Sequence, residues 1–284
     1  MMDWITEPLQ HIHFQRALFI CVLAGFANGY MSGFVVLRKS ALQVGSLSYS
    51  LLPGVAVGVI LFGLSQWGVF LGALVAALLV GFGSLFIARH SRIGQETALA
   101  IFYTTAFAGG IILFELAPVH IEVDQYLFGN ILFAVPEDMR IVFWVSAIVL
   151  VTLTLLRRPI VLVLFDSSAA QALGVPVRAI NYLLFGLMIL VLVSSLQVVG
   201  SLLALGLLVT PAAAVFLLTD RTEVLFWGGG LVGSASAVTA LFLAHHFDIP
   251  AGVTIILTLS MAFLLAWIFS PKYGILKFWN GVKF

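Results

Sequence analysis

Long apolar stretches follow one another along almost the whole of this 284-residue chain. About 20 apolar residues can cross the hydrocarbon core of a bilayer as a helix, in which the backbone polar groups are hydrogen-bonded internally. The sequence therefore predicts an all-α, polytopic membrane protein with a single transmembrane domain over residues 1–284. We expect spans at residues 16–37, 50–65, 67–88, 98–116, 139–156, 179–198, 200–219, 223–244 and 250–269.

The number of spans is predicted to be eight or nine. Residues 50–88 fit either two spans or one span with a re-entrant piece, and residues 179–219 are interrupted only at Gly200. Hydrophobic residues make up 62% of the chain and charged residues 9%, whereas roughly a quarter of a soluble domain is charged. The net charge of +1 argues against nucleic acid as a partner, and the single cysteine, Cys21, excludes an intramolecular disulfide.

With nine spans, the basic residues gather on one side of the membrane. By the positive-inside rule that side is cytoplasmic, so the N-terminus lies outside and the C-terminus inside. The expected location is a bacterial-type cytoplasmic membrane, with the lipid bilayer as the surroundings of the chain. Only Arg16 and Arg140 fall on the other side, while 11 of the 13 basic residues are on the cytoplasmic side: Arg38, Lys39, Arg89, Arg92, Arg157, Arg158, Arg178, Arg221, Lys272, Lys277 and Lys283.

No charged residue falls clearly at the middle of a predicted span. Such a charge costs about 3 kcal/mol on insertion scales, and ion-coupled carriers commonly depend on one. A stand-alone secondary carrier of a small solute is the alternative function, but it predicts inverted repeats and a titratable midplane residue, and neither is evident. An intramembrane enzyme is disfavoured because all six histidines fall at loops or span ends. We expect a transport subunit that is not an enzyme.

Helix breakers interrupt two of the apolar runs, at Pro53 and Gly54 and at Pro211. In a bilayer such breaks survive only where the freed backbone is buried in protein or faces a water-filled cavity. The three residues are therefore candidates for the wall of a transport pathway, although a simple kink is the commoner role. Three glycines at four-residue spacing over Gly25–Gly33 predict a face on which another helix packs closely.

A compact, mostly uncharged segment at about residues 157–178 separates the apolar runs on the basic side. Ser168, Ala169 and Ala170 form a small-residue helix that Gly174 would end, and such a helix can pack in the cleft of a soluble partner. An ordinary cytoplasmic connector explains the same segment equally well.

Seven fragments, in the same order along the chain, resemble the zinc/manganese/iron-type ABC importer permeases, the membrane subunits of metal-uptake ABC systems. Two of the seven are Ser48-Tyr-Ser-Leu-Leu-Pro-Gly-Val-Ala-Val-Gly58 and Tyr126-Leu-Phe-Gly-Asn-Ile-Leu132. The other five lie at residues 34–39, 95–98, 172–178, 196–200 and 208–221.

The resemblance implies several partners. The segment 157–178 would be the coupling helix that docks on a cytoplasmic ATPase, through Asp166, Ser168, Ala169, Ala170 and Gly174. ATP and Mg would bind to that ATPase, because no lysine of this chain follows a glycine as in a phosphate loop. The resemblance also implies an extracytoplasmic solute-binding protein and a second permease, either a copy of this chain or a homologue.

This chain departs from the family pattern at positions where the family binds metal. Gly45 and Tyr49 stand where the family has an Asp and a His one helical turn apart, and Gln125 stands where it commonly has a His. Glu96 is the one retained candidate ligand, although an acidic residue at a helix N-terminus has a structural explanation too. The sequence predicts no strong zinc or manganese site, with Tyr49 lining the pathway near the cytoplasmic end of the second span. The cargo is then a weakly held zinc, manganese or iron ion, a chelate or another small solute.

Overall fold

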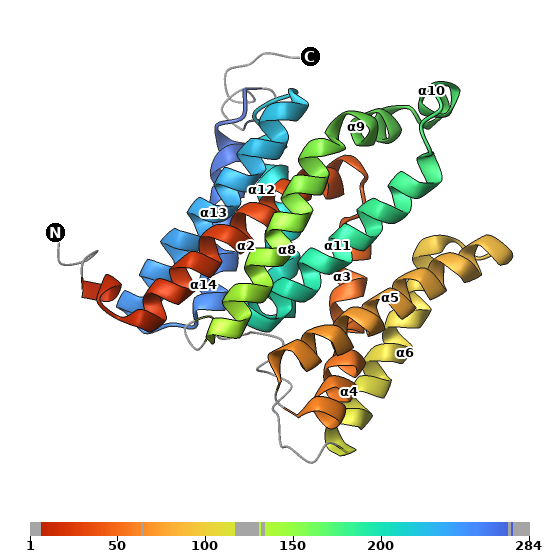
Figure 1. The fold of residues 1–284 in the computed structure, drawn as a ribbon. Helices are drawn as coiled ribbons and strands as arrows, with labels where there is room; N and C mark the ends of the chain where they lie inside the picture. The colour runs from red at the N-terminus through yellow and green to blue at the C-terminus, as the bar shows by residue number, and fades with distance from the viewer. Residues whose placement is uncertain (1–6, 64, 117–130, 132–133, 272–273, 275–284) are drawn as a thin grey trace.

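The computed structural model describes residues 7–63, 65–116, 131, 134–271 and 274. These residues are almost entirely helical and contain no strand (Figure 1). The helices are α2 (Ile12–Leu37), α3 (Ala41–Ser50), α4 (Leu52–Phe62), α5 (Gln66–His90), α6 (Gln95–Leu116), α8 (Pro136–Leu155), α9 (Arg157–Phe165), α10 (Ser167–Ala172), α11 (Val177–Val199), α12 (Ser201–Phe216), α13 (Thr222–Phe247) and α14 (Ala251–Ile268).

Eight helical segments of the described chain are long and apolar enough to cross a membrane, and α3 and α4 together form one of them. Helix α12 is a further apolar helix, but its 16 residues rise only about 24 Å, less than the roughly 30 Å of a hydrocarbon core. The predicted all-α architecture with eight or nine spans is confirmed, and the short α12 is the reason for the ambiguity.

The second span begins at Ala41, nine residues before the expected start. Serines at positions 46, 48 and 50 interrupt the apolar run there and hide the helix from a hydropathy argument. Each hydroxyl donates a hydrogen bond to a carbonyl of its own helix, on Leu42, Val44 and Leu47 respectively. Because the hydroxyls are satisfied within α3, the helix can lie in an apolar environment.

The break in this span is a kink at Leu51, which separates α3 from α4. Leu51 itself has helical backbone angles (φ −74°, ψ −26°), and its carbonyl still accepts a bond from the Val55 amide at 3.0 Å. Pro53 lies in the first turn of α4, where a missing N–H costs little. The alternative of a re-entrant piece over residues 50–88 is wrong, because α3–α4 and α5 form two full-length segments.

Helices α2 and α13 pack with their backbones in close approach. A Cβ at Gly29 would overlap the carbonyl oxygen of Gly229, and one at Gly25 would lie 2.8 Å from the Cα of Ser234. A Cβ at Gly33 would overlap the ring of Phe226. The packing face predicted for Gly25–Gly33 is confirmed, since no larger side chain fits at these three positions.

The helices form two groups joined by a central helix. Helices α2, α12, α13 and α14 pack on one side, α4, α5 and α6 on the other, and α11 contacts members of both groups (Figure 1). A buried polar contact fixes α11 to α2, because the Asn28 side-chain amide donates a 2.7 Å hydrogen bond to the Ser195 hydroxyl. Interhelical hydrogen bonds of this kind hold helices together where no water competes.

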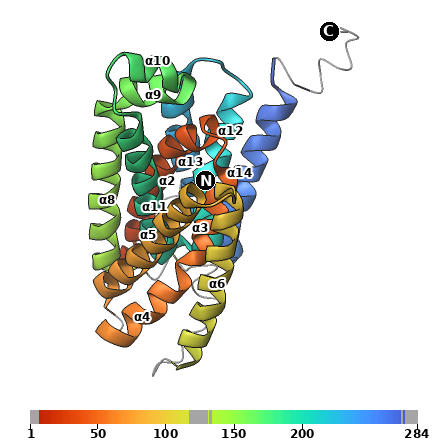
Figure 2. The ribbon, with the colours of Figure 1, turned by 90° about the vertical axis from the view of Figure 1, so that its right-hand side faces the viewer.

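One end of the bundle carries most of the positive charge. Helices α9 and α10 lie across this end, beside the turns that join α2 to α3 and α12 to α13 (Figures 1 and 2). We call it the basic end. Of the ten described lysines and arginines, eight belong to it: Arg38, Lys39, Arg89, Arg92, Arg157, Arg158, Arg178 and Arg221.

Candidate functional site

The segment α9–α10 is built around a single carboxylate. Asp166 separates the two helices in an extended conformation and caps α10. Its Oδ1 accepts hydrogen bonds from the Ser168 amide at 3.0 Å, the Ser168 hydroxyl at 2.6 Å and the Ala169 amide at 2.9 Å. These bonds, the Ser168 hydroxyl first, hold the pKa of Asp166 below its usual range. The cap gives a six-residue helix a defined start, which such a short helix needs.

The exposed side of this segment differs from the one expected from sequence. Ala170 is fully buried against the helix core, so it cannot contact a partner, and its place in the docking surface is corrected. The large apolar residues Phe165 and Leu173, which are 66% and 72% exposed, frame α10 instead. Gly174 ends the segment with a left-handed backbone (φ +78°) and open space around it, as a helix-ending glycine does.

An ion pair connects the segment α9–α10 to α13, a member of the group formed by α2, α12, α13 and α14. Arg157, the first residue of α9, pairs with Glu223 in the first turn of α13. Glu223 is 70% exposed, and such exposed pairs contribute at most about 1 kcal/mol to stability. The pair therefore matters for where α9 is held relative to α13 more than for the stability of the fold.

Tyr49 lies deeper in the protein than expected. It is the ninth residue of the 22-residue second span, near the middle, and the predicted place near the end of that span is wrong. Its ring packs between two aromatic residues of α6, with ring centroids 6.2 Å from Tyr103 and 5.9 Å from Phe107. All three rings are partly exposed, so they form an aromatic face on one side of the bundle.

Gly45 precedes Tyr49 by one helical turn and lies on the same face of α3. A Cβ at Gly45 would have one neighbour within 4 Å, the Leu205 Cδ1 of α12 at 3.5 Å. The position thus has room for a side chain, unlike the glycines between α2 and α13. Helix α3 is flanked by α6 and α12, and its partly exposed surface of Gly45, Ser46 and Tyr49 is the candidate wall of a pathway.

Glu96 and Tyr49 are not brought together in one subunit. Glu96 is an exposed residue in the first turn of α6, seven residues before Tyr103, which corresponds to about 10 Å along the helix. No group of three or more His, Cys, Asp or Glu side chains suited to a metal occurs in the described parts of the chain. Gln125, the other candidate, lies outside the described residues.

The helix breakers have packing explanations. A Cβ at Gly54 would overlap the carbonyl oxygen of Gly72 in α5, and one at Gly110 of α6 would lie 2.8 Å from the Pro53 nitrogen. Pro211 is buried inside α12. The structure thus places Gly54 and Pro211 in helix packing. Backbone atoms of α12 on both sides of Pro211 form hydrogen bonds with α2.

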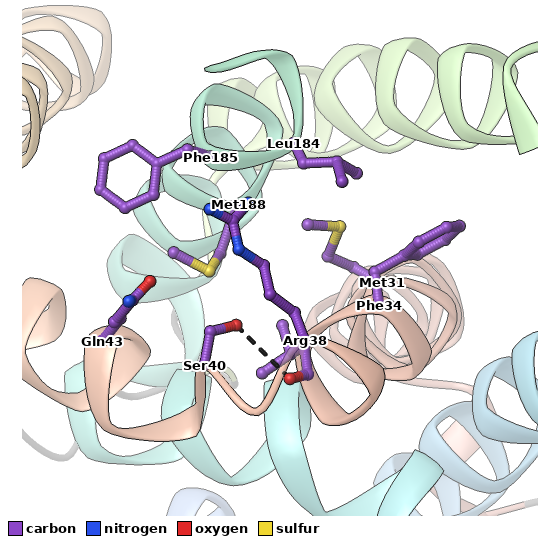
Figure 3. A pocket seen from close by; sticks show the side chains of 9 residues that line it. Met31, Phe34, Arg38, Ser40, Gln43, Leu184, Phe185 and Met188 are labelled. Carbon is purple, nitrogen blue, oxygen red and sulfur yellow. Dashed lines mark hydrogen bonds between the residues drawn. The ribbon is translucent and has the colours of Figure 1, made fainter. Parts of the chain in front are cut away.

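A small pocket at the basic end surrounds Arg38 (Figure 3). The Arg38 side chain extends between Met31 and Met188 and donates a 3.5 Å hydrogen bond to the Asn181 carbonyl of α11. Burial lowers the pKa of this guanidinium. About 10 Å³ is open to the centre of a water-sized sphere, which is room for a single water and no larger ligand. Arg38 therefore ties the turn after α2 to α11.

A comparison with protein families decides the class. The family described as the ABC 3 transport family matches residues 10–270 of this chain. The chain belongs to the ABC 3 transport family. The resemblance found from the sequence fragments is thereby confirmed, and the chain is a multi-pass membrane permease of an ATP-binding-cassette transporter.

The similarity to other family members extends over the full length. The manganese transport system membrane protein MntC of Halalkalibacterium halodurans is 34% identical over 282 residues, which is 99% of this chain and 95% of that protein. The manganese import system permease protein ScaB of Streptococcus parasanguinis is 34% identical over 273 residues, 96% of both chains. The chelated iron transport system membrane protein YfeC of Yersinia pestis is 28% identical over 277 residues, 97% of this chain and 92% of that protein.

A solved structure supports the fold of this family member. The structure described as PsaBC from Streptococcus pneumoniae in complex with Fab matches with a TM-score of 0.88 at 32% sequence identity. The match covers 98% of this chain and 99% of that chain, so no helix group of the described fold is peculiar to this protein.

Proposed function

We propose that this permease imports manganese or iron, free or as a chelate, with energy from a separate cytoplasmic ATPase. The observation that carries the proposal is the full-length similarity to the manganese permeases MntC and ScaB, at 34% identity. The likeness to the chelated-iron permease YfeC keeps iron within the proposed substrate class.

The ATPase is proposed to dock on α9–α10 at the basic end, which is then the cytoplasmic end. The exposed Phe165 and Leu173 supply apolar anchors on either side of α10, and Ser168 supplies a small polar surface between them. The Asp166 cap keeps α10 folded while it is pushed or pulled. ATP and Mg belong to the ATPase in this proposal, and this chain holds no cofactor of its own.

Movement at α10 has a physical route into the membrane helices. The Arg157–Glu223 pair connects the start of α9 to α13, and α13 is interlocked with α2 through Gly29 and Gly229. Helix α2 continues through the Arg38 turn into α3, which carries Gly45 and Tyr49. ATP-driven closure would thus change the position of the candidate pathway wall.

The pathway is proposed to run past the Tyr49 face, between this permease and a second copy or a homologue. The face offers phenol oxygen and backbone but no imidazole or thiolate, and oxygen ligands suit manganese better than zinc. Cargo would cross without a strong site in this chain. Selection would then rest on an extracytoplasmic binding protein that delivers the cargo at the opposite end.

The experiment is the metal content of cells that carry or lack this permease, measured by elemental analysis in metal-poor medium. Loss of the gene is expected to lower manganese or iron several-fold, and a plasmid copy should restore it. Unchanged manganese and iron, with a fall in some other solute, would overturn the substrate. Cysteine labels at Ser168 should react only from the cytoplasmic side, and labelling from outside would overturn the orientation.

A further inference from the structure

A second, larger pocket lies at the basic end between α5 and α11. It offers about 300 Å³ to the centre of a water-sized sphere, enough for a small ligand group. Neither the docking segment α9–α10 nor the Tyr49 face contributes to its wall. The lining residues are Phe82, Leu85, Phe86, Arg89, His90 and Tyr182.

The polar groups of this pocket suit an anion. The Arg89 guanidinium carbon lies 5.0 Å from the centre of the Tyr182 ring, a cation–π arrangement that holds the group beside α11. No acidic residue lines the pocket, and no ion pair joins Arg89 to a carboxylate within the described residues. A guanidinium fixed in this way keeps donors available for phosphate oxygens.

His90 lies beside Arg89 in the wall of the pocket, and two contacts fix its ring. Its Nδ1 lies 2.8 Å from the Phe86 carbonyl oxygen. A carbonyl can only accept, so Nδ1 carries the proton of this bond. The Nε2 of the neutral ring is then an acceptor and does not bind a phosphate oxygen, so His90 contributes the wall of the pocket and Arg89 its donors. The Phe86 ring packs against the imidazole with centroids 4.3 Å apart, which fixes the ring further.

An apolar strip leads from the pocket along α5 into the span. Val75, Leu79, Phe82 and Phe86 follow one another at four-, three- and four-residue spacing, which places them on one face. Their side chains are 53%, 68%, 37% and 63% exposed. The strip ends at the basic groups, so an amphipathic molecule would lie with its polar head at Arg89 and its tail along α5.

We propose that this pocket binds the phosphate headgroup of an anionic phospholipid, with one acyl chain along the α5 strip. The site combines a planar cation with an aromatic wall at the edge of a membrane span, features that suit a lipid phosphate. A metal cation is repelled by Arg89, so the pocket is not part of the proposed metal pathway. The lipid joins α5 to α11, the helix that follows α10, and so braces the contact between the two helix groups.

The test measures phospholipid retained by the assembled transporter after purification from membranes that contain phosphatidylglycerol. Arg89→Gln is expected to lower retained phosphatidylglycerol about fivefold, the effect of one interfacial charge, and to leave phosphatidylethanolamine unchanged. Arg92→Gln is the matched control, because Arg92 is an exposed arginine three residues further along at the same end and does not line the pocket. Arg89→Lys keeps the charge but loses the planar, forked set of guanidinium donors, so an intermediate loss is expected.

Two further arms distinguish other occupants. Glycerol phosphate, which has the headgroup without the tail, should displace retained phosphatidylglycerol only weakly. If it displaces phosphatidylglycerol as well as added phosphatidylglycerol does, the pocket is a site for free phosphate and the proposal is overturned. A photoreactive residue at Phe86 should cross-link to lipid, whereas a cross-link to a second permease would make the strip a protein interface. Equal losses in Arg89→Gln and Arg92→Gln, or no loss in either, would also overturn it. Thermal unfolding of each variant confirms that the folded protein is compared.

Discussion

The Ser32 hydroxyl of α2 accepts a hydrogen bond from the Ala212 amide of α12 at 3.0 Å, one residue after Pro211. The same hydroxyl donates to the Val209 carbonyl at 3.2 Å. A proline inside a helix disturbs the backbone bonds around it, and in an apolar environment those groups need other partners. Ser32 supplies such partners from a neighbouring helix, so α2 supports the backbone of α12 on both sides of Pro211.

Replacement of Ser32 by alanine is expected to destabilise the permease by about 1–3 kcal/mol, because two hydrogen bonds between α2 and the backbone of α12 are lost. Thermal unfolding of the purified transporter measures the effect. Ser84→Ala is the control, since the buried Ser84 hydroxyl donates its hydrogen bond to the Gly81 carbonyl of its own helix. Equal stability of the two variants would contradict the bridging role.

Gly29→Ala is expected to destabilise the α2–α13 pair by about 1–3 kcal/mol or more, because the new methyl group would overlap the Gly229 carbonyl of a rigid backbone. Gly186→Ala is the matched control in a helix of the same bundle, where a Cβ would meet nothing within 4 Å. There the change should be neutral or slightly stabilising, as alanine favours helix over glycine. The yield of monodisperse protein and its unfolding temperature measure the effect of each of the two substitutions. Similar behaviour of the two would argue against the close approach.

Acid should loosen α10. Hydrogen bonds from Ser168 and Ala169 hold the pKa of Asp166 below its usual value in the folded state. The stabilisation is therefore present above the unfolded pKa of about 3.9 and is lost as the pH falls through the lower folded pKa. Hydrogen exchange of peptides covering residues 166–172 measures it, as protection relative to the intrinsic exchange rate at each pH, and lower protection is expected under acid. Asp166→Asn keeps a capping oxygen, so its protection should not change with pH, whereas Asp166→Ala should show low protection at every pH.

The docking surface is expected to depend on Phe165 and Leu173 more than on small residues. Leu173→Ser should weaken stimulation of the ATPase about tenfold, as expected when the burial of one leucine is lost, and leave the permease folded. Leu218→Ser is the control, because Leu218 is exposed at the basic end outside α9–α10. Ala170→Trp should instead unfold the segment itself, since Ala170 is fully buried. A normal ATPase response in Leu173→Ser would exclude this anchor.

The double change Gly45→Asp with Tyr49→His is expected to create tighter retention of manganese or zinc. Both side chains lie on one face of α3, and a Cβ at Gly45 has space beside Leu205. Tyr49→Ala alone should change the transport rate only modestly, because it trims a wall residue and removes no metal ligand. The affinity for the cargo should stay the same, since the binding protein sets it. Equilibrium dialysis of metal against the purified variants measures retention. Strong metal binding by the unchanged protein would contradict the absence of a site.

Much of the fold could be predicted from sequence because its signals are local. Apolar runs of span length, the four-residue glycine spacing of Gly25–Gly33 and the gathering of arginines at alternate turns each occupy a short stretch of chain. Bilayer physics converts those stretches into helices with little choice, since unsatisfied backbone is too costly in lipid. The class, the packing face and the basic end followed from these signals.

The tertiary structure decided which way individual residues face. Hydropathy could not reveal that Ala170 is buried while Leu173 is exposed, that Gly54 packs on Gly72, or that Tyr49 lies mid-span beside Tyr103. Some of these contacts join residues far apart in the chain, and others depend on the rotation of a helix about its own axis. Lipid and protein are similarly apolar surroundings, so hydropathy does not indicate which side of a helix faces which. Ser32 and Pro211 show the same limit. Each is ordinary in its own segment, and only the packing of α2 on α12 brings the Ser32 hydroxyl to the backbone beside the proline.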